Sequence, residues 1–166
     1  MHTEDFILAV LASSPDRKIR GKKRLQKLAY FLKVAGAKYD AQFDIRDFGP
    51  FSREVARAAQ LLAAKGVIEE KEEPIGVSRT FVTIYRLPVV GEGAAAKLGD
   101  KYKTILRDLD KFDTIDLEVA ATYDFFRSAG LSEDAARKKT VQLKPTKATT
   151  PVLRNIERIV GCLSHS

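Results

Sequence analysis

The sequence has very few of the residues that build disulfide frameworks and metal centres. Its 166 residues include one cysteine and two histidines. A single cysteine excludes an internal disulfide and a cysteine-rich zinc site, and low cysteine content is typical of a reducing cytoplasm. His2 and His165 stand at opposite ends of the chain, outside any zinc or catalytic-triad spacing. We therefore expect no metal ion and no cofactor.

Long apolar runs are also absent from the sequence. No stretch approaches the roughly 20 apolar residues that a membrane-spanning helix requires. Near the start, Glu4 and Asp5 stand where a secretory signal would carry positive charge. These absences predict a soluble cytoplasmic protein with no membrane partner.

Catalytic motifs are missing as well. There is no Walker A lysine loop, and Cys162 is best explained as a small apolar filler of an amphipathic helix. The segment 91–97, "GEGAAAK", matches a dinucleotide-type glycine spacing, but helices follow where that fold needs a parallel strand. The aspartates between residues 108 and 116 scatter around a helix and its end, which is typical of a solvated surface. We expect no catalytic residue, so the sequence predicts a protein that is not an enzyme.

Positive charge, in contrast, is abundant and unevenly spread. The net charge is +7 and the pI is about 9.5. Residues 1–66 contain 13 basic and 7 acidic side chains, a balance of +6, and residues 131–166 contain 7 and 3, a balance of +4. Basic proteins favour polyanionic partners, so a polyanion should meet the N-terminal third first.

Apolar periodicity predicts a mainly α protein with a small β-hairpin. The hairpin is expected over 67–72 and 79–87, and 43–48 is a short strand or extended link. We expect a winged-helix-like region over 1–90 and a helical extension over 91–166 that packs on it as one compact domain. The helices are expected over 3–13, 22–35, 53–65, 94–112, 116–129 and 132–143, and from 150 onward.

Helix, basic helix, helix and hairpin is the element order of a winged helix-turn-helix. In the second helix, Leu25, Leu28, Ala29 and Leu32 form an inward stripe, which should leave Lys23, Lys27 and Tyr30 on the opposite side. The segment between the second and third helices is longer than a tight helix-turn-helix turn. This length departs from the usual pattern.

Two stretches of the sequence resemble a known family. "KKRLQKLAYFLK" followed by "FGPFSREVARAAQLLAAKGVI", and later "LEVAATYDFFRSAGLSEDAARKKTVQLKP", resemble YwgA-like proteins and the related Panacea (SocA-like antitoxin) domain. The matching stretches span about residues 20–68 and 117–145. The matching positions are Lys23, Leu25, Gln26, Lys27, Leu28, Gly49, Pro50, Gly66, Ala121, Thr122, Lys144 and Pro145. The resemblance implies a winged-helix-like cytosolic protein of a toxin–antitoxin or defence locus, and it supplies no catalytic residues.

The stretch "RKIRGKKRLQK" is the main candidate for contact with nucleic acid. Lysine and arginine neutralise phosphates and release counterions, which gives salt-dependent affinity for DNA. The competing interpretation is a solvated start of a helix. The candidate phosphate contacts are Arg17, Lys18, Arg20, Lys22, Lys23, Arg24 and Lys27, with Lys138, Lys139, Lys144 and Lys147 as secondary contacts.

The third helix would then offer Arg53, Arg57 and Gln60 to a major groove, where arginine reads guanine and glutamine reads adenine. A plain solvated helix face explains these residues equally well. The acidic run "EEKEE" over residues 69–73 argues against DNA, because a wing usually brings lysine or arginine to the backbone.

Two hypotheses from different classes therefore remain. The first is a DNA-binding regulator that binds double-stranded DNA, with a homodimer expected if the site is palindromic. The alternative is a protein-binding antitoxin or adaptor that neutralises a partner, such as a toxin, without binding DNA. An enzyme with a small-molecule pocket is a third interpretation, for which the sequence offers no site residues.

Overall fold

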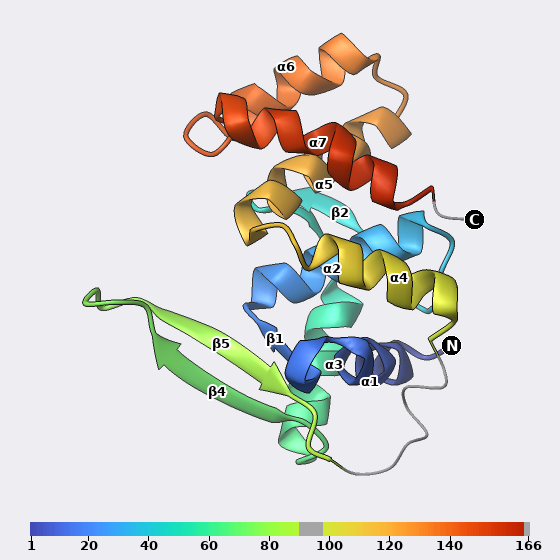
Figure 1. The fold of residues 1–166 in the computed structure, drawn as a ribbon, viewed down its shortest axis with the longest axis vertical. Helices are drawn as coiled ribbons and strands as arrows, with labels where there is room; N and C mark the ends of the chain where they lie inside the picture. Colours follow the sequence, from blue (N-terminus) through green and yellow to red (C-terminus); the bar gives the residue numbers. More distant parts are fainter. Residues whose placement is uncertain (90–97, 165–166) are drawn as a thin grey trace.

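A computed structural model describes residues 1–89 and 98–164, and its described part contains seven α-helices (Figure 1). Apolar periodicity therefore located most of the helices correctly. The predicted helix over 94–112 begins at Asp100 among the described residues, and the glycine-rich segment 91–97 lies outside them. The helices are α1 (Thr3–Ser13), α2 (Lys22–Val34), α3 (Arg53–Ala64), α4 (Asp100–Leu109), α5 (Thr114–Ser128), α6 (Glu133–Leu143) and α7 (Thr150–Cys162).

The strands form two small antiparallel sheets. The larger sheet has the order β1-β5-β4, built from β1 (Lys18–Arg20), β4 (Glu69–Pro74) and β5 (Phe81–Arg86). The smaller sheet pairs β2 (Asp44–Arg46) with β3 (Gly49–Phe51) through a two-residue loop. The prediction of a mainly helical protein with a small β-hairpin is confirmed at the level of secondary structure.

The sequence did not predict strand β1, which follows a short 3₁₀ helix, η1 (Pro15–Arg17). It has only one buried residue, Ile19, so its pattern is too short to show a period of two. It forms because it pairs along β5, with Lys18 opposite Arg86 and Arg20 opposite Ile84. The start of the basic run is therefore the edge of a sheet and not a free loop.

Local signals set the limits of α3. The Ser52 side chain accepts a hydrogen bond from the backbone N–H of Val55, which makes it the N-cap. Gly66, just beyond the helix, has a φ of 70°, the left-handed conformation that glycine adopts most easily. The amphipathic stripe between these signals buries Val55, Ala59 and Leu62 against the core.

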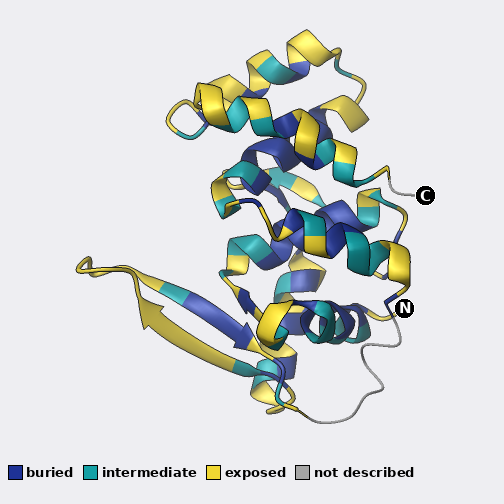
Figure 2. Cartoon of the chain, in the orientation of Figure 1, coloured by how far each residue is buried: buried dark blue, intermediate teal, exposed yellow. Residues whose placement is uncertain are grey.

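One continuous hydrophobic core joins the two expected regions of the chain (Figure 2). Helix α5 lies at its centre and packs against α2, α6, α7 and β3. Its apolar residues Leu117, Val119, Ala120 and Ala121 have no exposed surface, as expected for a helix that is apolar around most of its circumference. None of the described helices has the length and apolar character needed to cross a membrane.

The β4–β5 hairpin extends away from the helical body (Figure 1). Strand β4 is exposed along most of its length, and Figure 2 shows that burial on β5 ends before the turn. The outer part of the hairpin therefore makes no contribution to the core.

The prediction that Lys27 and Tyr30 lie on an outward side of α2 is wrong. Lys27 and Tyr30 are 1% and 5% exposed, because α2 lies among α3, α4, α5 and β3 and has almost no solvent side. The Tyr30 hydroxyl donates to Asp124 at 2.7 Å. Polar residues on a helix face that looks hydrophilic can thus be buried when a neighbouring element supplies their hydrogen bonds.

Candidate functional site

Most cations of the basic run form bonds inside the molecule. Arg17 donates to the carbonyl oxygens of Leu87 and Pro88 at 3.2 and 3.1 Å. Arg20 pairs with Glu73 on β4 at 2.8 Å. These arginines attach β1 to the hairpin and the segment that follows it.

Two more cations of the run face acids from elsewhere in the chain. Lys22 lies 3.8 Å from Glu70, and Arg24 pairs with Asp110 at 3.1 Å while donating to the carbonyl of Phe112 at 2.8 Å. The acidic run on β4 thus supplies two partners to the basic run, Glu70 and Glu73. In this run Lys18 is the exposed cation without such a partner among the described residues.

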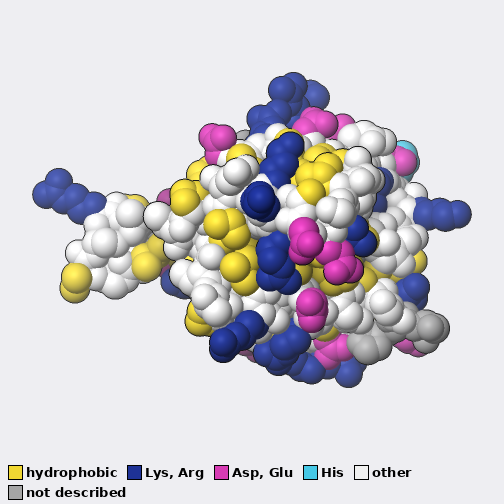
Figure 3. All heavy atoms as spheres, turned by 90° about the horizontal axis from the view of Figure 1, so that it is seen from above, with side chains coloured by type: hydrophobic (Ala, Val, Ile, Leu, Met, Phe, Trp, Pro, Cys, Tyr) yellow, Lys and Arg dark blue, Asp and Glu magenta, His cyan; other side chains and the backbone are white. Residues whose placement is uncertain are grey.

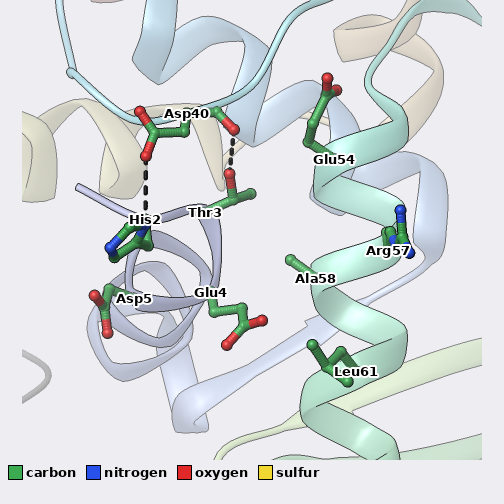
Figure 4. A pocket seen from close by; sticks show the side chains of 9 residues that line it. All are labelled: His2, Thr3, Glu4, Asp5, Asp40, Glu54, Arg57, Ala58 and Leu61. Carbon is green, nitrogen blue, oxygen red and sulfur yellow. Dashed lines mark hydrogen bonds and ion pairs between the residues drawn. The ribbon is translucent and has the colours of Figure 1, made fainter.

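Arg53, Arg57 and Gln60 are all exposed on α3, as predicted. Arg57 borders a hollow of about 530 Å³ between α1 and α3, and Figure 4 shows it across this hollow from the α1 side chains. A phosphate group would meet repulsion there, because carboxylates dominate the charge of the lining. The acidic residues of this hollow are Glu4, Asp5, Asp40 and Glu54.

Positive charge gathers instead around one buried carboxylate. We call Lys23, Lys27, Lys144 and Lys147 the lysine cluster. Glu118, from the centre of α5 and 1% exposed, accepts hydrogen bonds from Lys144 at 2.7 Å and from Lys147 at 2.9 and 3.0 Å. Lys144 also donates to the Asp47 carbonyl in the β2–β3 loop. Four lysines therefore lie near one described carboxylate, which forms ion pairs with two of them, Lys144 and Lys147.

The aromatic ring of Phe48 brings the lysine cluster together. The Nζ atoms of Lys23, Lys147 and Lys144 lie 3.7, 5.2 and 5.9 Å from the ring centroid, which are cation–π distances. Phe48 is 51% exposed, so the cluster reaches the surface at this ring.

A tight turn of the chain places Phe48 there. Asp47 and Phe48 are the two loop residues of the β2–β3 hairpin, and Gly49 follows with a φ of 81°. A Cβ atom on Gly49 would lie 2.5 Å from the Thr122 hydroxyl oxygen and 3.6 Å from the Lys27 Nζ. Only glycine therefore allows the hairpin to approach α5 so closely.

Lys27 is the most deeply buried member of the cluster. Its Nζ donates to the Pro50 carbonyl at 2.7 Å. Burial lowers the pKa of Lys27 from its usual 10.5 to about 7; the charge of Glu118 opposes this, and the other three lysines add to it. Burial and the neighbouring lysines lower the pKa of Lys23 in the same way, although Glu118 again opposes the change.

Glu118 shows the opposite balance. Its burial would raise the pKa, but the hydrogen bonds and charges of Lys144 and Lys147 outweigh it and lower the pKa below the usual range. The site therefore holds Glu118 ionised while it resists full protonation of Lys27.

A cavity of about 300 Å³ lies beside the cluster, between α2 and α3. It is lined by both apolar and cationic side chains, and by Gln60 of α3. Lys22, Lys23, Lys27 and Gln60 are thus four predicted site residues that border one cavity, whereas Arg57 lies at another hollow.

The sequence did not predict Glu118 and Phe48 as site residues, and it treated Lys144 and Lys147 as surface contacts. One signal was present: a glutamate stands in the middle of a helix that is otherwise apolar on most sides. A charge in such a place is rarely left unpaired. No group of three or more His, Cys, Asp or Glu side chains in the described ranges could hold a metal ion.

Replacing Lys27 by Met should remove a pH dependence of stability. The folded pKa lies below the unfolded one, so the unfolded chain binds more protons above pH 7, and wild-type stability should rise with pH. The slope of stability against pH should reach about 1.4 kcal/mol per pH unit between pH 7 and 8.5. Below pH 7 both states bind the proton, so the full cost of burying the charged amine should lower the stability. Urea unfolding across this range measures it.

The Lys27→Met variant keeps the buried stem but binds no proton at this position, so most of the rise in stability across that range should disappear. Lys18→Met, at an exposed position, is the matched control and should keep the wild-type slope. A wild-type slope in Lys27→Met would show that Lys27 is not the group responsible.

Searches with this chain find no matching family model, no matching curated protein and no matching solved structure. The architecture and the lysine cluster are therefore the basis for any statement about function.

Proposed function

We propose that this chain is a non-enzymatic protein-binding adaptor or antitoxin, which contacts its partner with the β4–β5 hairpin. The observation that supports the proposal is the projecting end of the hairpin (Figure 1). Ile75 and Phe81 are 47% and 60% exposed there, and Val77 is fully exposed. Exposed apolar side chains at the end of a projecting hairpin, away from the core, favour burial against another protein.

Charge also favours a protein over duplex DNA. Arg20 and Lys22, which would have gripped phosphates, face Glu73 and Glu70 of the same hairpin. A duplex would have to compete with these internal pairs and would meet the remaining carboxylates of β4. On another face, at the α6–α7 end of the molecule, Figure 3 shows lysine and arginine side chains in separate groups, with hydrophobic and acidic side chains between them.

The architecture is compatible with a winged helix. The order α1, β1, α2, α3, β4, β5, with β1 paired to β5, supports this assignment, and the β2–β3 hairpin would be an insertion between the second and third helices. Family membership stays a prediction. It gains support because Lys23, Lys27, Gly49, Thr122 and Lys144, which belong to the matching positions, meet at the lysine cluster.

The proposal is tested by capture of a partner with the tagged chain in its native cells. Val77→Asp combined with Phe81→Asp should reduce the captured partner at least about tenfold, because each charge would be buried in the interface. Both residues are exposed, so the variant should fold like the wild type. Ile115→Asp is the control: Ile115 is 47% exposed in the first turn of α5, where a negative charge is well tolerated.

Equal capture by the hairpin variant and the control would contradict the proposal. Capture of no protein at all, together with salt-sensitive binding of duplex DNA, would favour the second candidate, a DNA-binding regulator.

The observation that favours the second candidate is the exposure of Arg53, Arg57 and Gln60 on α3, with Arg79 exposed near the hairpin turn. Arg53→Gln with Arg57→Gln is the appropriate variant for its shift assay. A Lys27→Glu change would instead place a carboxylate in a buried site and would test folding.

A further inference from the structure

The cavity between α2 and α3 combines an apolar body with a cationic side. Phe48, Phe51 and Tyr85 contribute aromatic rings, and Ala56 and Ala59 of α3 keep the space between the helices open. Its volume of about 300 Å³ lies at the lower end of the range of small-molecule sites in proteins. The size suits a single ring with one polar group better than a nucleotide or a peptide.

The charge of the lining has one sign. Lys22, Lys23 and Lys27 border the cavity, and no Asp or Glu does so among the described residues. Lys22 faces Glu70 at 3.8 Å. Lys23 and Lys27 form no ion pair with a described carboxylate, because Glu118 is occupied by Lys144 and Lys147.

Lys23 and Lys27 also act from one direction. They are four residues apart on α2, so their side chains lie one above the other on the same helix face. Two lysine side chains on one side of an apolar space match a ligand with one anionic group at the end of an apolar body.

We propose that this cavity binds a small organic anion, with its carboxylate or phosphate group held by Lys23 and Lys27 and its apolar body against Phe48, Phe51 and Tyr85. The inference is independent of the proposed partner binding, which uses the hairpin tip. Such a ligand would compensate the excess positive charge that the fold leaves at the lysine cluster.

The charges around Lys27 add a dependence on pH. The groups that face it are Glu118 from α5, Lys23 from α2, and Lys144 and Lys147 from the segment after α6. Its low pKa means that the amine loses its proton near pH 7 in the empty site, and an anion would raise that pKa. Affinity should therefore be highest below pH 7 and should fall as pH rises above it.

The experiment titrates the ¹⁵N-labelled full chain with benzoate, phenyl phosphate and the neutral benzamide. At concentrations up to about 10 mM, at least one anion should shift the backbone amides of Lys23, Phe48 and Phe51 in a saturable way. Benzamide should bind at least about tenfold more weakly, because it has no charge for the lysines. The preferred anion identifies the head group.

Three variants separate the site from general charge effects. Lys23→Gln should weaken anion binding about tenfold, whereas Lys18→Gln removes an exposed charge that does not line the cavity and should leave affinity unchanged. Lys27→Met should bind weakly without the pH dependence. The wild-type pattern of amide resonances checks that each variant is folded.

Equal binding of benzamide and the anions would overturn the proposal. Shifts confined to another surface, no saturable shift with either anion, or equal losses in Lys23→Gln and Lys18→Gln would overturn it as well. None of these results bears on whether the hairpin binds a protein.

Discussion

Replacement of Glu118 by Gln should lower the free energy of unfolding by about 3–5 kcal/mol at pH 7, the usual cost of removing one partner of a buried ion pair. Lys144, whose side chain is 2% exposed, would lose the only described carboxylate beside it. Lys147 would lose the same partner. The neutral amide has nearly the same volume and retains an acceptor oxygen, so the loss of stability reports mainly the missing charge and not a change in packing. Urea unfolding followed by circular dichroism measures the effect.

An exposed ion pair offers the matched control for this variant. Glu4 lies 3.8 Å from Lys65 at the surface, and Glu4→Gln should cost less than about 1 kcal/mol. Lys144→Met in the Glu118→Gln background should recover part of the loss, because it removes the unpaired charge while its stem still fills the site. A loss below about 1 kcal/mol in Glu118→Gln would contradict a buried, charge-balancing role.

Replacement of Gly49 by Ala should destabilise the protein by about 3 kcal/mol through two effects that add. The first is backbone strain, because Gly49 has a φ of 81°, which costs about 1 kcal/mol or more for a residue with a Cβ atom. The second is overlap, because the new Cβ would lie 2.5 Å from the Thr122 hydroxyl oxygen and 3.4 Å from the Glu118 carbonyl oxygen. The hairpin would have to move away from α5, and Phe48 would move with it.

Gly66 separates the two effects. Its φ is 70°, but a Cβ there meets no atom within 4 Å, so Gly66→Ala should cost only the strain, about 1 kcal/mol. Thr122→Ala should remove most of the overlap, so its combination with Gly49→Ala should be less harmful than the sum of the single changes. Equal losses in Gly49→Ala and Gly66→Ala would show that the close approach to α5 contributes nothing.

Both variants also bear on the lysine cluster as a site. Glu118 sets its charge balance, and Gly49 sets the position of the ring on which three of its lysines meet. An anion that binds beside Lys23 and Lys27 should also stabilise Glu118→Gln, because it would replace part of the negative charge that the variant lacks.

The helices could be predicted because their information is local. A recurring apolar stripe defines a buried face, Ser52 and Gly66 mark the ends of α3, and Pro151 marks the start of α7. The hairpin was predicted from strand-like runs and a glycine-containing turn. Strand β1 was not, because three residues with one buried side chain contain no period, and the strand exists only where β5 pairs with it.

The candidate site could not be predicted because its contacts join distant parts of the chain. Arg24 bonds to Asp110, 86 residues away, and Lys144 donates to Asp47, 97 residues away. Helical periodicity placed Lys27 on an outer face because it counts apolar residues only. It contains no information on which other element will cover a polar side chain and satisfy its hydrogen bonds.

The sequence by itself determined the helices, the hairpin and the excess of positive charge, since these follow from composition and from patterns within a dozen residues. Only the tertiary structure decided which cations are used up in internal bonds and which remain around Phe48 and Glu118. The physical reason is that a charge is compensated by its neighbours in space, and packing alone brings those neighbours together.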